Sequence, residues 1–271
     1  MNRRRLLQIS IVGALSAQGN LPLLAASKKS GKGGLTWGGD NRFVEPAAIE
    51  PITGFLPEFS PLKVGAMNRE FSANYRLVRQ YGQAGGLANN FDCGSLELAF
   101  SGNTCKTSET RLKRDGMHNT VRIEHEFRGE YNTAKNWSLE STVVDRPESR
   151  LVESGSWDGK SMTVRSNSWT NSYPTGKLLI ARHSLLPLLA SGKLKKAPLQ
   201  FDLLEECALR RDQTIRYAGK IEIPIAGGTA ILDSYAHTGY GSVPTHYLVD
   251  EAGRVQLITM QTVNWALGKL T

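Results

Sequence analysis

Strict alternation of apolar and charged side chains most constrains what this chain of 271 residues can fold into. Residues 121–128 read Val-Arg-Ile-Glu-His-Glu-Phe-Arg, so every second side chain is apolar or aromatic and the others are charged. Because successive side chains of a β-strand point to opposite faces, this pattern predicts a strand with one buried and one solvated face. Similar runs predict further strands at 71–81, 94–100, 137–144, 150–157 and 162–169.

Two turn signals predict that neighbouring strands pair in antiparallel order. Residues 157–160 read Trp-Asp-Gly-Lys, and Asp-Gly is favoured in type I′ hairpin turns, whose two central residues need positive φ. Residues 248–255 predict a second hairpin, with Gly253 at its left-handed position. Within the alternating run 221–225, Pro224 lacks a backbone donor, which predicts a strand at the edge of a sheet.

One segment, residues 177–190, has the period of a helix instead. Its apolar stripe repeats at three- and four-residue spacing and comprises Leu178, Leu179, Arg182, Leu185, Leu186 and Leu189. Pro187 is expected to kink or restart the helix, because proline lacks an amide hydrogen. We expect this helix to cover the open face of a sheet. The alternative is that it gates a cavity or lies on a membrane surface, with the lysines of 193–196 toward phosphates.

About nine or ten antiparallel strands and one apolar helix predict a mainly β fold. The expected architecture is a strongly curved antiparallel sheet or half-open barrel, with the helix covering the concave face. This order of elements resembles the open half-barrel of outer-membrane lipoprotein carriers. A loosely covered concave face is a favourable place for an apolar ligand. The candidate ligand-binding residues are therefore Leu178, Leu179, Arg182, Leu185 and Leu186.

The first 26 residues have the three parts of a secretory signal. A basic start without acidic residues precedes an apolar centre at 9–17, and Ala17 and Ala26 offer two cleavage points. Residues 4–7 read Arg-Arg-Leu-Leu and resemble the twin-arginine (Tat) signal, which implies export by the Tat machinery to a periplasmic or extracellular location. A transmembrane segment needs about 20 apolar residues, so none is predicted.

Composition and charge set the domain organisation and the classes of partner. We expect residues 1–26 to be a signal peptide, 27–65 to be an irregular segment rich in Gly and Pro, and 66–271 to form a single β-rich domain. The formal net charge is +8, and removal of the three leader arginines leaves about +5. The basic clusters are not interleaved with aromatic residues, as grooves for single-stranded nucleic acids are, so we expect no nucleic-acid partner.

Three cysteines in an exported chain suggest a disulfide. Cys93 and Cys105 lie in turn-forming contexts, and a bond between them would contribute about 3 kcal/mol by closing a loop of that size. Cys207 is expected to be a small buried apolar residue rather than a reactive thiol. The chain has no Cys-x-x-Cys and no redox-cofactor motif, so the sequence predicts neither a metal nor a cofactor.

Side chains capable of catalysis gather near the end of the chain, and Tyr235, His237, His246 and Arg254 form the candidate catalytic set. Tyr235 and His237 share one face of a strand, but only one of the two possible registers brings His246 to that face. Such a set could abstract a proton beside a uronate carboxylate, with Arg254 neutralising the developing charge. The alternative is that these residues make ordinary cross-strand contacts. His125, on an apolar face, is expected to be a core residue.

The sequence therefore favours an exported protein that binds an apolar or glycan-like ligand without chemistry. A polysaccharide lyase or hydrolase is the alternative, and a surface interaction module is a third possibility. The character of the cavity separates them. A deep apolar pocket near residues 178–189 indicates a carrier, a polar groove that converges on His237 indicates an enzyme, and a completely filled barrel indicates the interaction module.

Overall fold

The structure, a computed structural model, describes residues 59–68, 70–81, 89–112, 118–143, 146–176, 178–225, 227–260 and 263–271. These residues belong to one compact unit, Gly33–Thr271. The predicted signal peptide and its cleavage points lie outside the described residues, as do positions 27–58 of the irregular segment.

The described residues form fifteen strands, two 3-10 turns and one short α-helix. The first eight strands are β1 (Glu70–Tyr81), β2 (Asn89–Ser101), β3 (Thr104–Leu112), β4 (His118–Arg128), β5 (Thr133–Val143), β6 (Arg146–Trp157), β7 (Ser161–Ser166) and β8 (Trp169–Pro174). The chain continues with β9 (Leu179–Ala181), η3 (Arg182–Ser184), α3 (Leu185–Ala190), η4 (Lys193–Lys195), β10 (Leu199–Glu205), β11 (Ala208–Ile225), β12 (Gly228–Gly239), β13 (Thr245–Val249), β14 (Val255–Met260) and β15 (Val263–Leu270).

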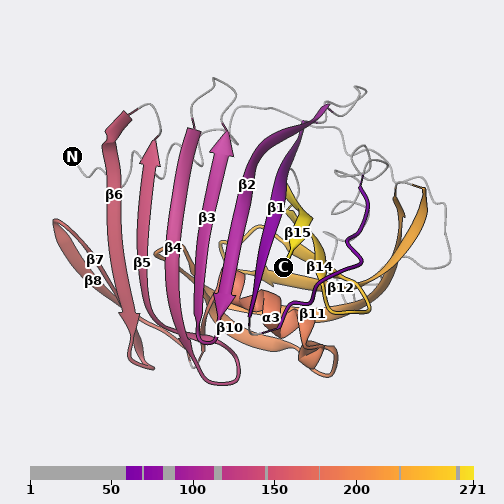
Figure 1. The fold of residues 1–271 in the computed structure, drawn as a ribbon. Coiled ribbons are helices and arrows are strands. Elements are labelled where there is room, and N and C mark those ends of the chain that lie inside the picture. Colours follow the sequence, from indigo (N-terminus) through magenta and orange to yellow (C-terminus); the bar gives the residue numbers. More distant parts are fainter. Residues whose placement is uncertain are drawn as a thin grey trace, which may run out of the picture. The chain divides into compact units, whose positions relative to one another are not determined.

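Twelve of these strands close into a ring (Figure 1). Their order is β4-β3-β2-β1-β15-β14-β13-β12-β11-β10-β9-β5, and β5 pairs with β4 again. The first and last strands, β1 and β15, are neighbours in the wall. Strands β6, β7 and β8 branch from β5 and extend the sheet beyond the ring.

The sheet is therefore a closed barrel, and the prediction of a half-open barrel is wrong. Closure depends on β9, which pairs in parallel with β10 and meets β5 at one pair, Ile180 opposite Thr133. This strand lies where the helical stripe was expected to begin. All three of its residues are buried, and an apolar run of that kind does not distinguish a fully buried strand from a helix.

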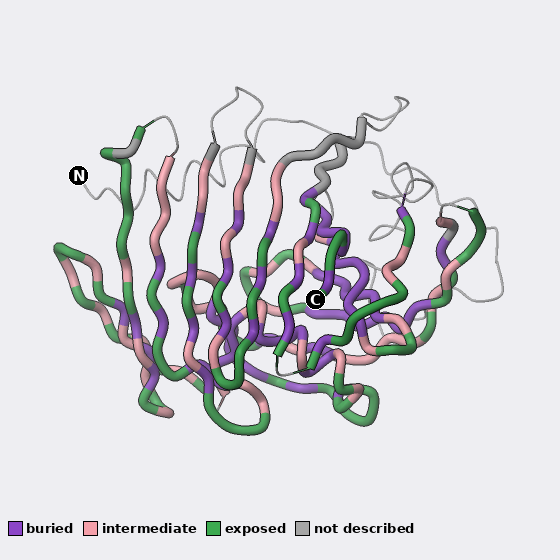
Figure 2. The backbone as a smooth tube through the Cα atoms, viewed as in Figure 1, coloured by how far each residue is buried: buried purple, intermediate pink, exposed green. Residues whose placement is uncertain are grey.

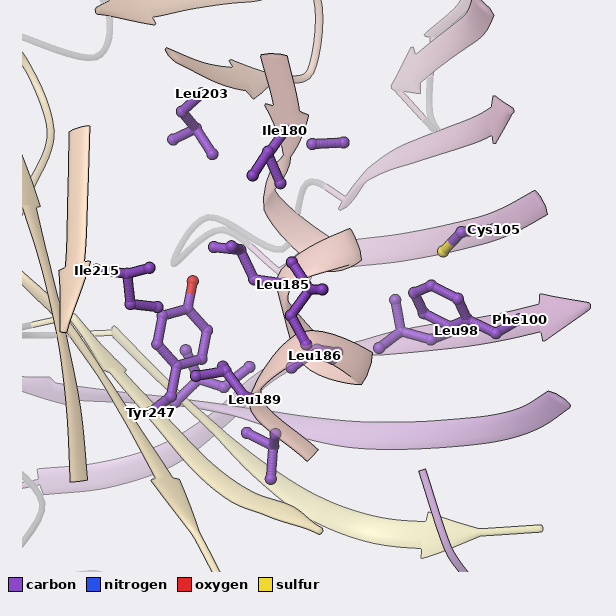
Figure 3. Packing of buried hydrophobic residues seen from close by; sticks show 14 of the residues in the cluster. Leu98, Phe100, Cys105, Ile180, Leu185, Leu186, Leu189, Leu203, Ile215 and Tyr247 are labelled. Carbon is purple, nitrogen blue, oxygen red and sulfur yellow. The ribbon is translucent and has the colours of Figure 1, made fainter. Parts of the chain in front are cut away.

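The helix α3 has six residues, fewer than the stripe predicted, and follows the 3-10 turn η3 directly. Pro187 is its third residue and lies in the first turn, where a missing amide hydrogen breaks no helical hydrogen bond. The helix fills the inside of the barrel rather than covering an open face. Figure 3 shows Leu185, Leu186 and Leu189 of the helix packed among Leu98, Phe100, Ile215 and Tyr247 of the walls. No helix in the described part of the chain is long and apolar enough to cross a membrane.

Alternation along the strands separates the inside of the barrel from its outer face (Figure 2). On β3, for example, Cys105 and Thr107 are buried whereas Lys106 between them is exposed. Part of the outer face is also buried, because Phe59 packs on a second apolar cluster from β11 to β15. The side-chain amide of Gln256 holds the nearby segment at Leu62 against the barrel. Its Oε1 accepts from the backbone N–H of Leu62 at 3.0 Å, and its Nε2 donates to the carbonyl of Leu62 at 2.8 Å.

Both predicted hairpins form. Strands β6 and β7 pair around Gly159, which has a φ of 104°, and β13 and β14 pair around Gly253, with a φ of 81°. Asp158 is not among the described residues with positive φ, so the first turn is not type I′. Its carboxylate instead accepts hydrogen bonds from the backbone N–H groups of Lys160 and Ser161, both at 2.7 Å.

The predicted disulfide between Cys93 and Cys105 is wrong. Cys105 is a free, buried cysteine and lies opposite Phe100 in the β2–β3 ladder. Cys93 precedes Phe100 by seven residues in β2, which is about 23 Å at about 3.3 Å per residue. A disulfide needs Cα atoms within about 7 Å. Cys207 is also free and is half-buried.

We expect Leu186→Ala to lower the free energy of unfolding by about 2–5 kcal/mol, because it leaves a cavity where the helix fills the barrel. The Leu186 side chain is fully buried. Urea denaturation measures the change. Val64→Ala is the control, because Val64 is 69% exposed and its loss should change stability by less than about 0.5 kcal/mol. Equal effects of the two substitutions would contradict the packing of α3 inside the barrel.

We expect iodoacetamide to alkylate Cys105 only after the protein unfolds in urea, and without any reductant. Burial keeps the thiol from the reagent and raises its pKa, so the reactive thiolate is scarce in the folded state. Peptide mass mapping checks the labelling, and a sample reduced before alkylation is the control. Labelling that requires prior reduction would mean that Cys105 is in a disulfide.

Candidate ligand-binding site

A polar cavity of about 40 Å³ lies beside the 3-10 turn η3. Its walls come from β3, β4, η3, β10 and the turn after β10. The lining residues are Thr107, Glu109, Arg111, Val121, Ile123, His125, Arg182, His183, Leu204, Glu205 and Glu206. One water needs about 10–15 Å³, so the cavity has room for a functional group of a few heavy atoms.

Strands β3 and β4 supply one wall of the cavity through their alternation. Glu109 lies opposite Val121 in the ladder, and Thr107 lies opposite Ile123. The next position of β4 on this face is His125. Because the two strands are in register, the period of two that buries Val121 also directs polar side chains of β3 into the same space.

Arg111 joins two carboxylates at the cavity. Its Nε and Nη2 atoms donate to the two oxygens of Glu109 at 2.7 and 2.8 Å, which is the strong bidentate geometry. Nη2 also donates to Glu206 at 3.0 Å. Burial alone would raise the pKa of Glu109, but the hydrogen bonds and charge of Arg111 outweigh it and lower that pKa. The side chains of Arg111 and Glu206 are 38% and 40% exposed, so they mark the mouth of the cavity.

A second charged group lies on the other side of the cavity. Arg182 forms an ion pair with one oxygen of Glu205, and Nε of Arg210 donates to the other oxygen at 2.9 Å. These two arginines lower the pKa of Glu205 against the opposing effect of its burial. Together the two groups contain three arginines and three glutamates, so their formal charges cancel.

His125 is the exception among these well-paired polar side chains. The residue is 2% exposed, and neither ring nitrogen has a hydrogen-bond partner among the residues that the structure describes. Its ring stacks on Phe127 with centroids 5.8 Å apart. Burial, with a smaller effect of His183, lowers the pKa of His125 to about 3, so the imidazole is neutral at pH 7. Burial likewise lowers the pKa of His183 to about 4.

The predicted catalytic residues do not come together. The pairing of His237 with Thr245 places His246 opposite Ala236, so the two histidines point to opposite faces of the wall. His246 is buried on the outer face, and burial together with Arg216 lowers its pKa to about 4. The register that would have placed both histidines on one face is not the one that forms.

The other members of that set make structural contacts. Nε2 of His237 lies 3.1 Å from Oε1 of Gln213, and Tyr235 is buried in the core. Nε of Arg254 donates to Asp250 at 2.7 Å within the β13–β14 turn. The four residues of this set therefore do not converge on His237. No three His, Cys, Asp or Glu side chains of the described chain are grouped to hold a metal ion.

The predicted ligand-binding residues on the helical stripe divide into two groups. Leu179, Leu185 and Leu186 are fully buried in the core, and Leu178 is half-buried against it. The cavity that Leu186 lines has a volume of about 10 Å³, which is too small for an apolar ligand. Arg182 differs from the leucines, because it lines the polar cavity.

Sequence reasoning missed the acidic and basic residues around Arg182. A usable signal was present in β3, where Thr107, Glu109 and Arg111 occupy alternate positions of a strand. The positions between them are polar as well, so the sequence of this strand indicates either two solvated faces or one solvated face and a polar interior. The sequence could not show that this phase is the one facing the inside of the barrel. The expectation that His125 is buried is correct, but its unpaired nitrogens were not foreseen.

Comparisons with known proteins identify the fold. No protein-family model matches the chain, and no curated protein matches it. A solved structure, described as a β-barrel-like protein of the domain of unknown function DUF1849 from Brucella abortus, is similar with a TM-score of 0.54. The two are 10% identical, and the match covers 76% of this chain and 99% of that one. This likeness supports a barrel-like architecture.

We expect the free energy of unfolding to fall when the pH is lowered from 7 to 5. An unfolded histidine takes up a proton near pH 6.5, whereas His125 stays neutral in the folded state down to about pH 3. The unfolded state therefore binds more protons, so acid destabilises the fold, by about 2 kcal/mol at pH 5 from this one residue. In His125→Phe the loss of stability between pH 7 and 5 should be smaller by that amount.

Urea denaturation at the two pH values measures this difference. Phe127→Leu is the control, since it changes the packing next to His125 but adds and removes no titrating group. The same loss of stability in His125→Phe as in the unaltered protein would mean that His125 titrates normally when folded.

Proposed function

We propose that this protein is exported and binds a polar, glycan-like ligand without chemistry, with one group of the ligand inserted into the cavity beside η3. The observation that carries the proposal is His125, a buried side chain without a hydrogen-bond partner among the described residues, in a cavity whose charged side chains all form ion pairs. A buried polar group that stays unpaired lowers the stability of the fold by about 1–3 kcal/mol. Stability therefore does not explain why a histidine occupies position 125.

The shape of the interior favours a polar ligand over an apolar one. The leucines of α3 occupy the space that an apolar ligand would need, and what remains beside Leu186 is about 10 Å³. The cavity of about 40 Å³ beside η3 is lined by charged residues and histidines. Because this cavity is not filled, binding is also favoured over the surface interaction module.

The proposal of export is supported by the predicted signal peptide, residues 1–26. Its arginine pair, mild apolar centre and small residues near Ala17 and Ala26 support a Tat-type signal and a periplasmic or extracellular location. A ligand rich in hydroxyl groups agrees with such a location. The carbohydrate-active enzyme has less support, because its residues lie on two faces of the wall and in a turn.

We expect protein purified from the cell envelope to retain a polar, hydroxyl-rich molecule that native mass spectrometry detects and that denaturation releases. The control is Val121→Phe, whose larger side chain occupies the cavity and should abolish retention. Urea denaturation of this variant establishes that it folds. The absence of any retained molecule, or retention of a lipid by both proteins, would contradict the proposal.

A further inference from the structure

The inserted group of the ligand can be specified further from the charges at the cavity. Each arginine already has a carboxylate partner, and Arg111 has two, at 2.7 and 3.0 Å. An anionic ligand would have to compete with these carboxylates, and a cationic ligand would have to compete with the arginines. Both would also lose their hydration in a cavity whose surrounding ion-pair groups, with Arg210 included, have no net formal charge. The site therefore disfavours charged groups of either sign.

The neutral imidazole of His125 adds a second restriction. A neutral imidazole has one N–H donor and one acceptor nitrogen, and in His125 both are without a partner among the described residues. A hydroxyl group can bond to either nitrogen, because it donates to the acceptor nitrogen or accepts from the N–H. An ether oxygen accepts only, and an ammonium group donates only.

The mouth and the wall of the cavity also suit a molecule that has several hydroxyl groups. Arg111 and Glu206 lie together at the mouth, half-exposed, and offer donors next to acceptors, as neighbouring hydroxyl groups require. Val121, Ile123 and Leu204 line the cavity with apolar surface, on which the C–H groups of a sugar ring can pack.

We infer that the cavity selects a neutral, hydroxyl-bearing sugar, that a ring hydroxyl bonds to His125, and that the site discriminates against acidic and amino sugars. This inference rests on the proposed function and defines its ligand class. His125 is then a specificity-determining residue, and the Arg–Glu pairs at the cavity neutralise one another so that no charged sugar is favoured.

The test compares glucose, glucuronate and glucosamine at pH 7, with NMR of protein labelled at the histidine rings. The chain has five histidines, so the spectrum is simple, and the signal missing from His125→Phe identifies His125. We expect glucose to shift the His125 signal and to bind at least about tenfold more tightly than either charged sugar, the usual scale when buried polar groups are left mismatched.

Two substitutions separate recognition from folding. His125→Phe should weaken glucose binding by about tenfold or more, whereas His125→Asn, which keeps a neutral donor and acceptor, should retain part of the binding and the preference for the neutral sugar. His237→Phe is the matched control, because His237 is as deeply buried but lies outside the cavity.

Three results would overturn the inference: no sugar shifts the His125 signal, a charged sugar binds as tightly as glucose, or His125→Phe binds glucose as the unaltered protein does. If envelope-purified protein still retains a polar molecule after any of them, the proposed function stands and only the ligand class is wrong. If nothing is retained and no sugar binds, both fail.

Discussion

The size of the ring is the constraint on which the rest of the structure depends. A barrel of about eight strands has an interior that its own side chains can fill, and the diameter grows with the number of strands. This ring has twelve strands, so its wall encloses more space than inward-pointing residues can occupy. The short helix α3 resolves this by placing four buried leucines inside the barrel. The same chain segment supplies β9, the strand that closes the ring. Closure of the wall and filling of the interior therefore depend on one continuous segment.

The cavity lies just beyond this filled region, and its chemistry differs from that of the core. Around α3 the contacts are apolar, whereas one turn earlier Arg182 and His183 border a space lined by paired charges. In proteins, replacing buried ion pairs by well-packed apolar residues is often neutral or stabilising, so stability alone does not explain these charges. At this cavity His125, buried beside Phe127 without a partner among the described residues, departs from optimal packing. Such departures are characteristic of sites that retain a group for recognition.

Local features of the fold were predictable from the sequence, and non-local ones were not. Alternation located β1, β4 and β6, and the Gly159 and Gly253 turns formed hairpins. The three buried residues of β9 were assigned to a helix, because their pairing partners lie in β5 and β10, far away in the sequence. The disulfide prediction failed for a related reason. The turn between β2 and β3 pairs Cys105 with Phe100, and no local signal specifies that register.

The candidate site shows the same limit. His125 was correctly expected on a buried face, but the sequence could not bring Glu109, Arg182 and Glu205 around one cavity, since they come from three separate elements. The register between β12 and β13 also determines which faces of the wall the histidines near the end of the chain occupy. A shift of one residue between β12 and β13 would have put His237 and His246 on one face.

The ring is joined unevenly. Most neighbouring strands share long ladders, whereas β9 contributes three residues and contacts β5 through a single pair. Local opening requires less free energy where fewer contacts are broken, so this seam is the place where the wall parts most readily. Arg182 and His183 follow β9 directly in the chain. Parting at the seam would therefore loosen the cavity while the long ladders and the leucines of α3 hold the rest of the barrel in place.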